Sequence, residues 1–289
     1  MTLAELLVAT AITTAVAGAA LAAVMPLQQG FAAQPEAAGL VQRIRVVSEL
    51  FASDVRRASL VLPLRIGDVA NDIVNGAFYR SDVVTLVTDS VDALASGLMT
   101  PTRSTTYHLK QDGEGVWQLM QYDGRASDQP AVEDVIALRF EYFGDGEPPL
   151  VVTAPHGDIR VTYGPVPPQP AVDSPNDSWG AGENCTIAND AGAQVSRLRN
   201  LGTGIVSIGE AMLTDGPWCP DAGHAFRFDA DLLRIRRVRV TVRLQAARPF
   251  RGLAGTVFAK AGSAGDPARF VPDETVSLEL APRNINVAR

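Results

Sequence analysis

The spacing of hydrophobic and polar positions changes near residue 60 and divides the chain into two parts. Before this point, an uncharged apolar run, Leu6–Met25, leads to residues 36–59, where apolar positions recur at spacings of three and four, as in an amphipathic helix. After it, apolar and polar residues alternate in short runs, as in half-buried β-strands. The pattern predicts an α+β protein whose long N-terminal α-helix packs on an antiparallel β-sheet head.

Several alternating runs after residue 60 predict the strands of the head. Residues 111–115, QDGEG, separate two of these runs, so we expect a β-hairpin there. In the last run, we expect Val276, Leu278 and Leu280 to face inward. The runs are residues 82–88, 104–110, 116–122, 136–143, 237–244 and 275–280.

Between residues 146 and 225, prolines and glycines interrupt the alternating pattern. We therefore expect a long, partly irregular insertion, and long loops in compact domains are usually functional or disordered. Both cysteines, Cys185 and Cys219, lie in it. A disulfide between them would stabilise the loop by about 3–4 kcal/mol in the chain-entropy model, and it needs an oxidising compartment. The alternative is two buried free thiols.

The run Leu6–Met25 has the composition of a membrane-spanning helix. As a helix it extends for roughly 30 Å, the thickness of the hydrocarbon core of a bilayer. Alanine and glycine dominate it, and small side chains let helices pack closely. No basic residue precedes it, whereas a secretory signal peptide has a basic n-region, so we do not interpret it as a cleaved signal.

Pro26 follows the apolar run. Because proline lacks a backbone donor and clashes with the preceding turn, we expect Pro26 to end or kink the helix. The expected organisation is a hydrophobic transmembrane or filament-core helix over 1–25, a kink and amphipathic helix over 26–59, and a β-rich globular head over 60–289.

Glu5 is the only ionisable side chain in residues 1–35. Placing a carboxylate at the edge of an apolar segment costs free energy, so the residue is expected to have a charged or hydrogen-bonding partner or a functional role. One explanation is the helix dipole, which favours an acid in the first turn by about 0.3–1 kcal/mol. A second explanation comes from a family resemblance.

The first residues, MTLAELLVA, resemble the start of mature type IV pilins and type II secretion pseudopilins. In that family a prepilin peptidase cuts after a glycine and methylates the new N-terminus. Residue one is usually Phe, with Met accepted, and residue five is Glu. This chain departs from the pattern because no basic leader ending in glycine is present. Either the numbering begins at the mature N-terminus, or the start codon is placed too far downstream.

The resemblance implies roles for Glu5 and Met1. Met1 would be the processed and methylated residue, and the Glu5 carboxylate would neutralise the α-amino group of Met1 in a neighbouring subunit. Two charges in an apolar filament core are tolerable only when paired, so this pair would set the axial register.

Two further segments, residues 50–58 and 135–142, resemble J-type minor pseudopilins and W-type minor pilins. The function implied is a structural subunit that inserts in the inner membrane with a periplasmic head. It would assemble into a periplasmic type II secretion pseudopilus or a cell-surface type IV pilus, at the tip or in priming assembly. Implied partners are other pilin subunits, the prepilin peptidase, the inner-membrane assembly platform and, before assembly, membrane lipid.

Two alternatives remain open. The chain can instead be an adhesive or ligand-binding tip subunit that acts through residues 146–225. It can also be an exported enzyme that borrows a hydrophobic anchor, although no catalytic motif supports this. No histidine lies in an HExxH pattern or beside a cysteine at metal-binding spacing, and no GxSxG elbow is present, so we expect no enzyme, metal or cofactor.

Two charged groups of residues have more than one interpretation. Asp221, His224, Asp229 and Asp231 can hold a cation or form a solvated loop. The alternating Arg237, Arg239 and Arg243 can bind a polyanion or form a solvated face paired with carboxylates such as Glu279. The net charge of −7 argues against nucleic-acid binding.

Overall fold

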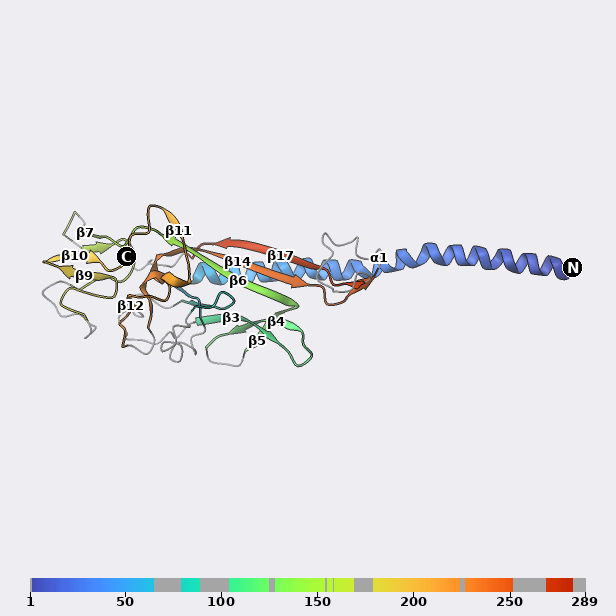
Figure 1. Cartoon of the computed structure of the whole chain (residues 1–289), viewed down its shortest axis with the longest axis horizontal. Helices are drawn as coiled ribbons and strands as arrows, with labels where there is room; N and C mark the ends of the chain where they lie inside the picture. The colour runs from blue at the N-terminus through green and yellow to red at the C-terminus, as the bar shows by residue number, and fades with distance from the viewer. Residues whose placement is uncertain are drawn as a thin grey trace. The chain divides into compact units, whose positions relative to one another are not determined.

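The computed structural model describes residues 2–64, 79–88, 104–124, 128–153, 155–157, 159–168, 179–223, 227–251 and 269–282 (Figure 1). The chain folds into two compact units. One combines Met1–Val46 with Arg243–Thr275, and the other combines Val47–Val242 with Val276–Arg289. The architecture is α+β, as the sequence pattern predicts: one long helix, antiparallel strand pairs and short 3-10 turns.

The N-terminal helix α1 runs without interruption from Leu3 to Arg57. Its first turn carries Glu5 and its last turn Arg56 and Arg57, which match the positive and negative ends of the helix dipole. The helix continues through Pro26, so this residue does not end it, and the kink stays a prediction. Methionine, leucine and glutamine, which favour helix, flank the proline.

A five-stranded sheet has the order β1-β2-β3-β4-β5, with every neighbouring pair antiparallel. The predicted hairpin lies between β3 and β4. Asp112 makes its turn: one carboxylate oxygen accepts the N–H groups of Glu114 and Val116 at 2.9 and 2.8 Å. The strands are β1 (Leu60–Leu62), β2 (Val84–Val87), β3 (Ser104–Gln111), β4 (Trp117–Tyr122) and β5 (Gln129–Glu133).

A four-stranded sheet has the order β11-β6-β14-β17. Its strands confirm the long alternating runs of the sequence: in β14, Val238, Val240, Val242 and Leu244 are buried on one face. The strands are β6 (Val135–Asp145), β11 (Ile205–Ile208), β14 (Ile235–Gln245) and β17 (Asp273–Leu280).

An aromatic cluster joins the last turns of α1 to the strands of the second unit. The ring of Phe51 lies 5.0 Å from that of Tyr107 on β3 and 5.7 Å from that of Phe140 on β6. The Tyr107 hydroxyl donates to Asp54 at 2.5 Å. Val47, Phe51 and Val55 are buried, as the spacing of the amphipathic stripe predicts.

The described part of residues 146–225 is more regular than the predicted insertion. It contains two hairpins, and its strand β11 pairs with β6 in the four-stranded sheet. Gly144 of β6 passes close to the end of η3 (Ala230–Arg234): a Cβ at Gly144 would lie 2.4 Å from the Arg234 carbonyl oxygen, so glycine is needed there. The remaining elements are β7 (Val151–Thr153), β8 (Ile159–Val161), β9 (Ile187–Asp190), β10 (Ala193–Ser196), η2 (Glu210–Met212), β12 (Trp218–Cys219), β13 (Phe228–Asp229), η3 (Ala230–Arg234), β15 (Phe250–Arg251) and β16 (Arg269–Phe270).

Candidate membrane and assembly site

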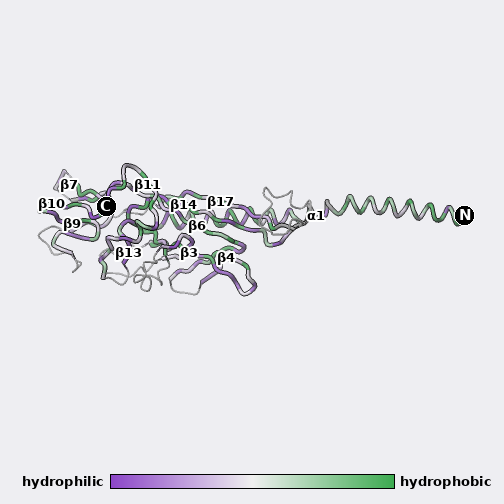
Figure 2. Tube along the Cα trace, viewed as in Figure 1, coloured by the Kyte–Doolittle hydropathy of each residue, from purple (hydrophilic) through white to green (hydrophobic). Residues whose placement is uncertain are grey.

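The first half of α1, Leu3–Met25, is long and apolar enough to cross a membrane, judged by length and composition. All of its side chains are exposed, including Leu7, Ile12 and Val16. Figure 2 shows this stretch as largely hydrophobic. Exposed apolar surface costs about 25 cal/mol for each Å² left in water, so this segment needs lipid or other apolar helices around it.

Thr2 and Glu5 form a reciprocal capping box at the start of α1. The N–H of Thr2 donates to Glu5 Oε2 at 2.7 Å, and the N–H of Glu5 donates to Thr2 Oγ1 at 3.3 Å. The other carboxylate oxygen, Oε1, has no hydrogen-bond partner among the described residues. Glu5 therefore supports its own helix and keeps one acceptor for another group. Met1, the predicted processing and pairing residue, lies outside the described residues.

Threonine hydroxyls inside the apolar segment are satisfied within the helix. Thr10 donates to the Leu7 carbonyl at 2.9 Å, and Thr13 donates to the Ala9 carbonyl at 2.8 Å. Because these hydroxyl groups already donate to backbone carbonyls, they do not need water as a hydrogen-bond partner in an apolar environment. These polar residues therefore do not oppose insertion in a membrane.

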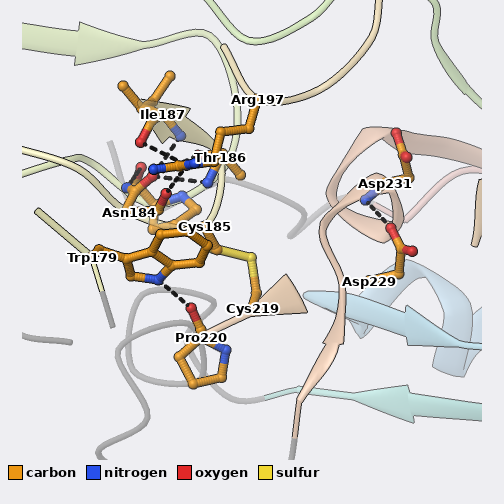
Figure 3. Close-up of a disulfide and its surroundings, with 11 residues drawn as sticks. Trp179, Asn184, Cys185, Thr186, Ile187, Arg197, Cys219, Pro220, Asp229 and Asp231 are labelled. Atoms are coloured by element: carbon orange, nitrogen blue, oxygen red, sulfur yellow. Dashed lines mark hydrogen bonds between the residues drawn. A yellow bond between two sulfur atoms is a disulfide. The ribbon is translucent and has the colours of Figure 1, made fainter. Parts of the chain in front are cut away.

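Cys185 and Cys219 form a disulfide, which confirms the predicted pair. It joins the start of the β9–β10 hairpin to β12 (Figure 3). Around it, the indole of Trp179 donates to the Pro220 carbonyl at 2.7 Å. The Asn184 side chain accepts the N–H of Ile187 at 2.9 Å. The bridge thus fastens a region held mainly by turns and short strands.

An ion pair and a stacked ring strengthen the same region. The Arg197 guanidinium lies 4.2 Å from the ring centre of Trp179 and pairs with Glu183 at 2.5 Å. The N–H of Asn189 also donates to Glu183 at 2.9 Å, and this bond, followed by Arg197, lowers the pKa of that carboxyl. Each of these groups has a structural partner.

The acidic residues between 221 and 231 serve the local fold. Asp221 accepts the N–H of Gly223 at 2.6 Å, Asp229 caps η3, and Asp231 pairs with Arg234. His224 lies outside the described residues. Within the described ranges, no three His, Cys, Asp or Glu side chains are grouped so that they could hold a metal ion.

The arginine stripe on β14 is paired with carboxylates of β17. Arg237 and Arg239 contact Glu279 at 3.1 and 2.6 Å, and Arg243 contacts Asp273 at 2.5 Å. This confirms the interpretation as a solvated, paired face. Glu279 itself has a lowered pKa, caused first by its hydrogen bond from Arg239.

No protein-family model and no curated protein matches the chain. Among solved structures, a type IV-like pilin from Thermus thermophilus aligns with it at 10% identity and a TM-score of 0.28, covering 83% of this chain and 96% of the other. At this identity and TM-score, the likeness carries no argument about fold or function. The functional conclusion therefore depends on the residues described above.

Proposed function

We propose that this chain is a pilin-like structural subunit, held in a membrane by residues 3–25 and assembled through them into a filament. The uncovered apolar half of α1 carries this proposal. It is continuous with a second half that is built into a β-rich unit through Phe51. One helix thus has both a segment that needs apolar neighbours and a segment that anchors the head.

Glu5 is the proposed assembly residue. It stands at the start of the apolar segment, and its Oε1 is available to the α-amino group of Met1 in a neighbouring subunit. A buried ammonium and carboxylate stabilise each other only at close range, so they would fix the offset between subunits. The proposed partners are other pilin subunits, a prepilin peptidase that processes Met1, and an inner-membrane assembly platform.

The finer proposal is a minor pilin or pseudopilin at a filament tip or in priming assembly. Its support is the resemblance of residues 50–58 and 135–142 to W-type and J-type subunits. The head would then lie in the periplasm before assembly, and in a periplasmic pseudopilus or a surface pilus afterwards.

Substitutions at Glu5 and Thr2 separate the assembly role from the capping role. Glu5→Gln keeps a capping-box side chain but removes the charge, and Thr2→Ala keeps the charge but removes the capping hydroxyl. We expect Glu5→Gln to abolish recovery of the protein in sheared filaments while it stays in the membrane fraction. Thr2→Ala should retain most of its assembly. Equal assembly of both variants would contradict the proposal.

A second candidate function, adhesion or ligand binding by the tip, is favoured by exposed apolar side chains in the region between 146 and 225. Leu150, Val152 and Val166 are 56%, 51% and 50% exposed. Because β11 belongs to the four-stranded sheet, deleting the whole region would damage the head. Leu150→Lys with Val152→Lys is the better test: target binding lost with filaments intact supports adhesion.

A further inference from the structure

The connection between β14 and β17, residues 246–272, is a basic segment of an acidic chain. Its net charge is +3, whereas that of the whole chain is −7. A local cluster of positive charge attracts anions even where the net charge of the protein is negative. The charged residues of the connection are Arg248, Arg251, Lys260, Asp266 and Arg269.

The two short strands of this connection, β15 and β16, bring like charges together. Their antiparallel register places Phe250 opposite Phe270 and Arg251 opposite Arg269. Two like charges directly opposite each other destabilise a strand pair. Arg248, just before β15, is exposed and has no ion-pair partner among the described residues. An anion beside this hairpin would relieve the repulsion between its arginines.

The connection begins close to the end of the apolar span. The span ends at Met25, and Glu36 on the same helix accepts the N–H of Ala247 at 2.8 Å. In Figure 1, the orange and red strands of this unit lie beside α1 up to the point where the uncovered half of the helix begins. Glu36 lies about 16 Å along the helix from Met25, and lipid headgroups occupy about 5–7 Å of this rise. The start of the connection is therefore about one Debye length from the headgroups.

We propose that Arg248 and the β15–β16 hairpin bind the anionic headgroups of the membrane that residues 3–25 cross. This inference rests on the proposed function, because only an inserted helix brings the hairpin to a bilayer. Arginine matches the geometry of a phosphate group, and arginine beside phenylalanine is typical of segments that lie on a membrane surface. The contact would hold the first compact unit against the bilayer before assembly, and extraction of the subunit would break it.

Hydrogen exchange on the full chain in lipid nanodiscs tests the proposal. One set of discs contains phosphatidylcholine alone, and the other also contains about 30% phosphatidylglycerol, an anionic lipid. Exchange of the β15 amides should be about tenfold slower in the anionic discs. Each basic side chain near an anionic surface strengthens binding about fivefold, and binding opposes opening of the strand pair. In about 0.5 M salt the difference should fall below about twofold, since the Debye length shortens to about 4 Å.

Paired substitutions identify the charges that act. Arg251→Gln with Arg269→Gln removes two positive charges together with the repulsion between them, so the hairpin should persist while the difference between the discs falls below about twofold. Arg80→Gln with Arg160→Gln is the matched control. It removes the same charge at two exposed positions of the second compact unit and should keep the difference of about tenfold.

The outcomes separate this contact from the membrane span itself. Equal exchange in the two discs, or slowing that salt does not weaken, would overturn the contact while a chain that still elutes with the discs leaves the span intact. A chain that enters neither disc would contradict the proposed function and this inference together. Slowing that is seen only in assembled filaments would assign the arginines to an acidic face of a neighbouring subunit, and would also overturn the proposal.

Discussion

Phe51 is the side chain through which the helix contacts both main sheets. It is fully buried between Tyr107 and Phe140. We expect Phe51→Ala to lower the free energy of unfolding by about 3–5 kcal/mol, because it removes a large apolar side chain and leaves a cavity. Urea unfolding followed by circular dichroism measures this. Val46→Ala, at a position that is 45% exposed on the same helix, should change it by less than about 0.5 kcal/mol.

Arg234 and Arg239 offer a comparison of the same substitution in two environments. Arg234→Met would leave the Asp231 carboxylate and three carbonyl groups without their buried donor, at an expected cost of about 3–5 kcal/mol. Arg239→Met breaks an exposed pair with Glu279 and should barely change stability. Thermal unfolding of the two variants measures the difference, and equal losses would contradict this account of the buried pair.

The sequence distinguishes some of these residues and not others. The pairing of the stripe on β14 with Glu279 follows from alternation, because the arginines share one face of a strand. Arg234 precedes that run, and its burial depends on carbonyl groups brought by β6 and the loop before β11, which no local pattern reveals. The cap at Thr2, in contrast, has a local sequence signal, because the Thr-x-x-Glu spacing is typical of a capping box.

At the scale of elements, the disulfide is the strongest single constraint on the region between 179 and 223. It joins residues separated by 34 positions. In the chain-entropy model its removal costs about 3–4 kcal/mol. Cys185→Ser with Cys219→Ser should therefore lower the unfolding midpoint, and a reducing agent should lower that of the wild type and leave the double variant unchanged. If the reducing agent lowers the unfolding midpoints of the wild type and the double variant equally, its effect does not come from breaking this disulfide.

Strand lengths explain which elements the sequence could predict. β6, β14 and β17 are long enough for their alternation to stand out, and the amphipathic stripe of α1 extends over several turns. β7 to β12 are only a few residues long, and turns held by Asn184 and Asp229 replace regular pairing there. Their positions follow from the disulfide and from contacts distant in sequence. The helix continues through Pro26, since the flanking residues favour helix, and the kink expected there stays a prediction.

At the scale of the whole molecule, one span of α1 is expected to decide where the protein resides. Val16→Arg places a charge in the middle of Leu3–Met25 and should cost about 2.5–3.5 kcal/mol of insertion free energy. Val41→Arg adds the same charge to the same helix outside that span, at a position that is 66% exposed. Carbonate extraction of membranes should release more of the first variant than of the second. Equal retention of both would argue against residues 3–25 as the membrane segment.

The sequence-based organisation placed its boundaries after residues 25 and 59, by composition and period. The two compact units meet within α1 between Val46 and Val47, inside the amphipathic half. Boundaries drawn from amino-acid composition separate segments that prefer lipid from segments that prefer water. The compact units, by contrast, group segments that contact one another in the folded chain. The first unit groups Arg243–Thr275 with the N-terminal part of the helix, although the two segments are far apart in the sequence. The hydrophobic period of the helix could not predict this grouping.

The Cys185–Cys219 bridge also limits how far the head can be drawn out by a mechanical load. A chain pulled at its two ends lengthens by about 3.4 Å for each residue released, but the 34-residue separation closed by the bridge cannot extend. The oxidised head should therefore reach a contour length about 110 Å shorter than the reduced head, since the bridged Cα atoms stay 5.0 Å apart. In a filament under tension, the bridge would act as a fixed stop on extension.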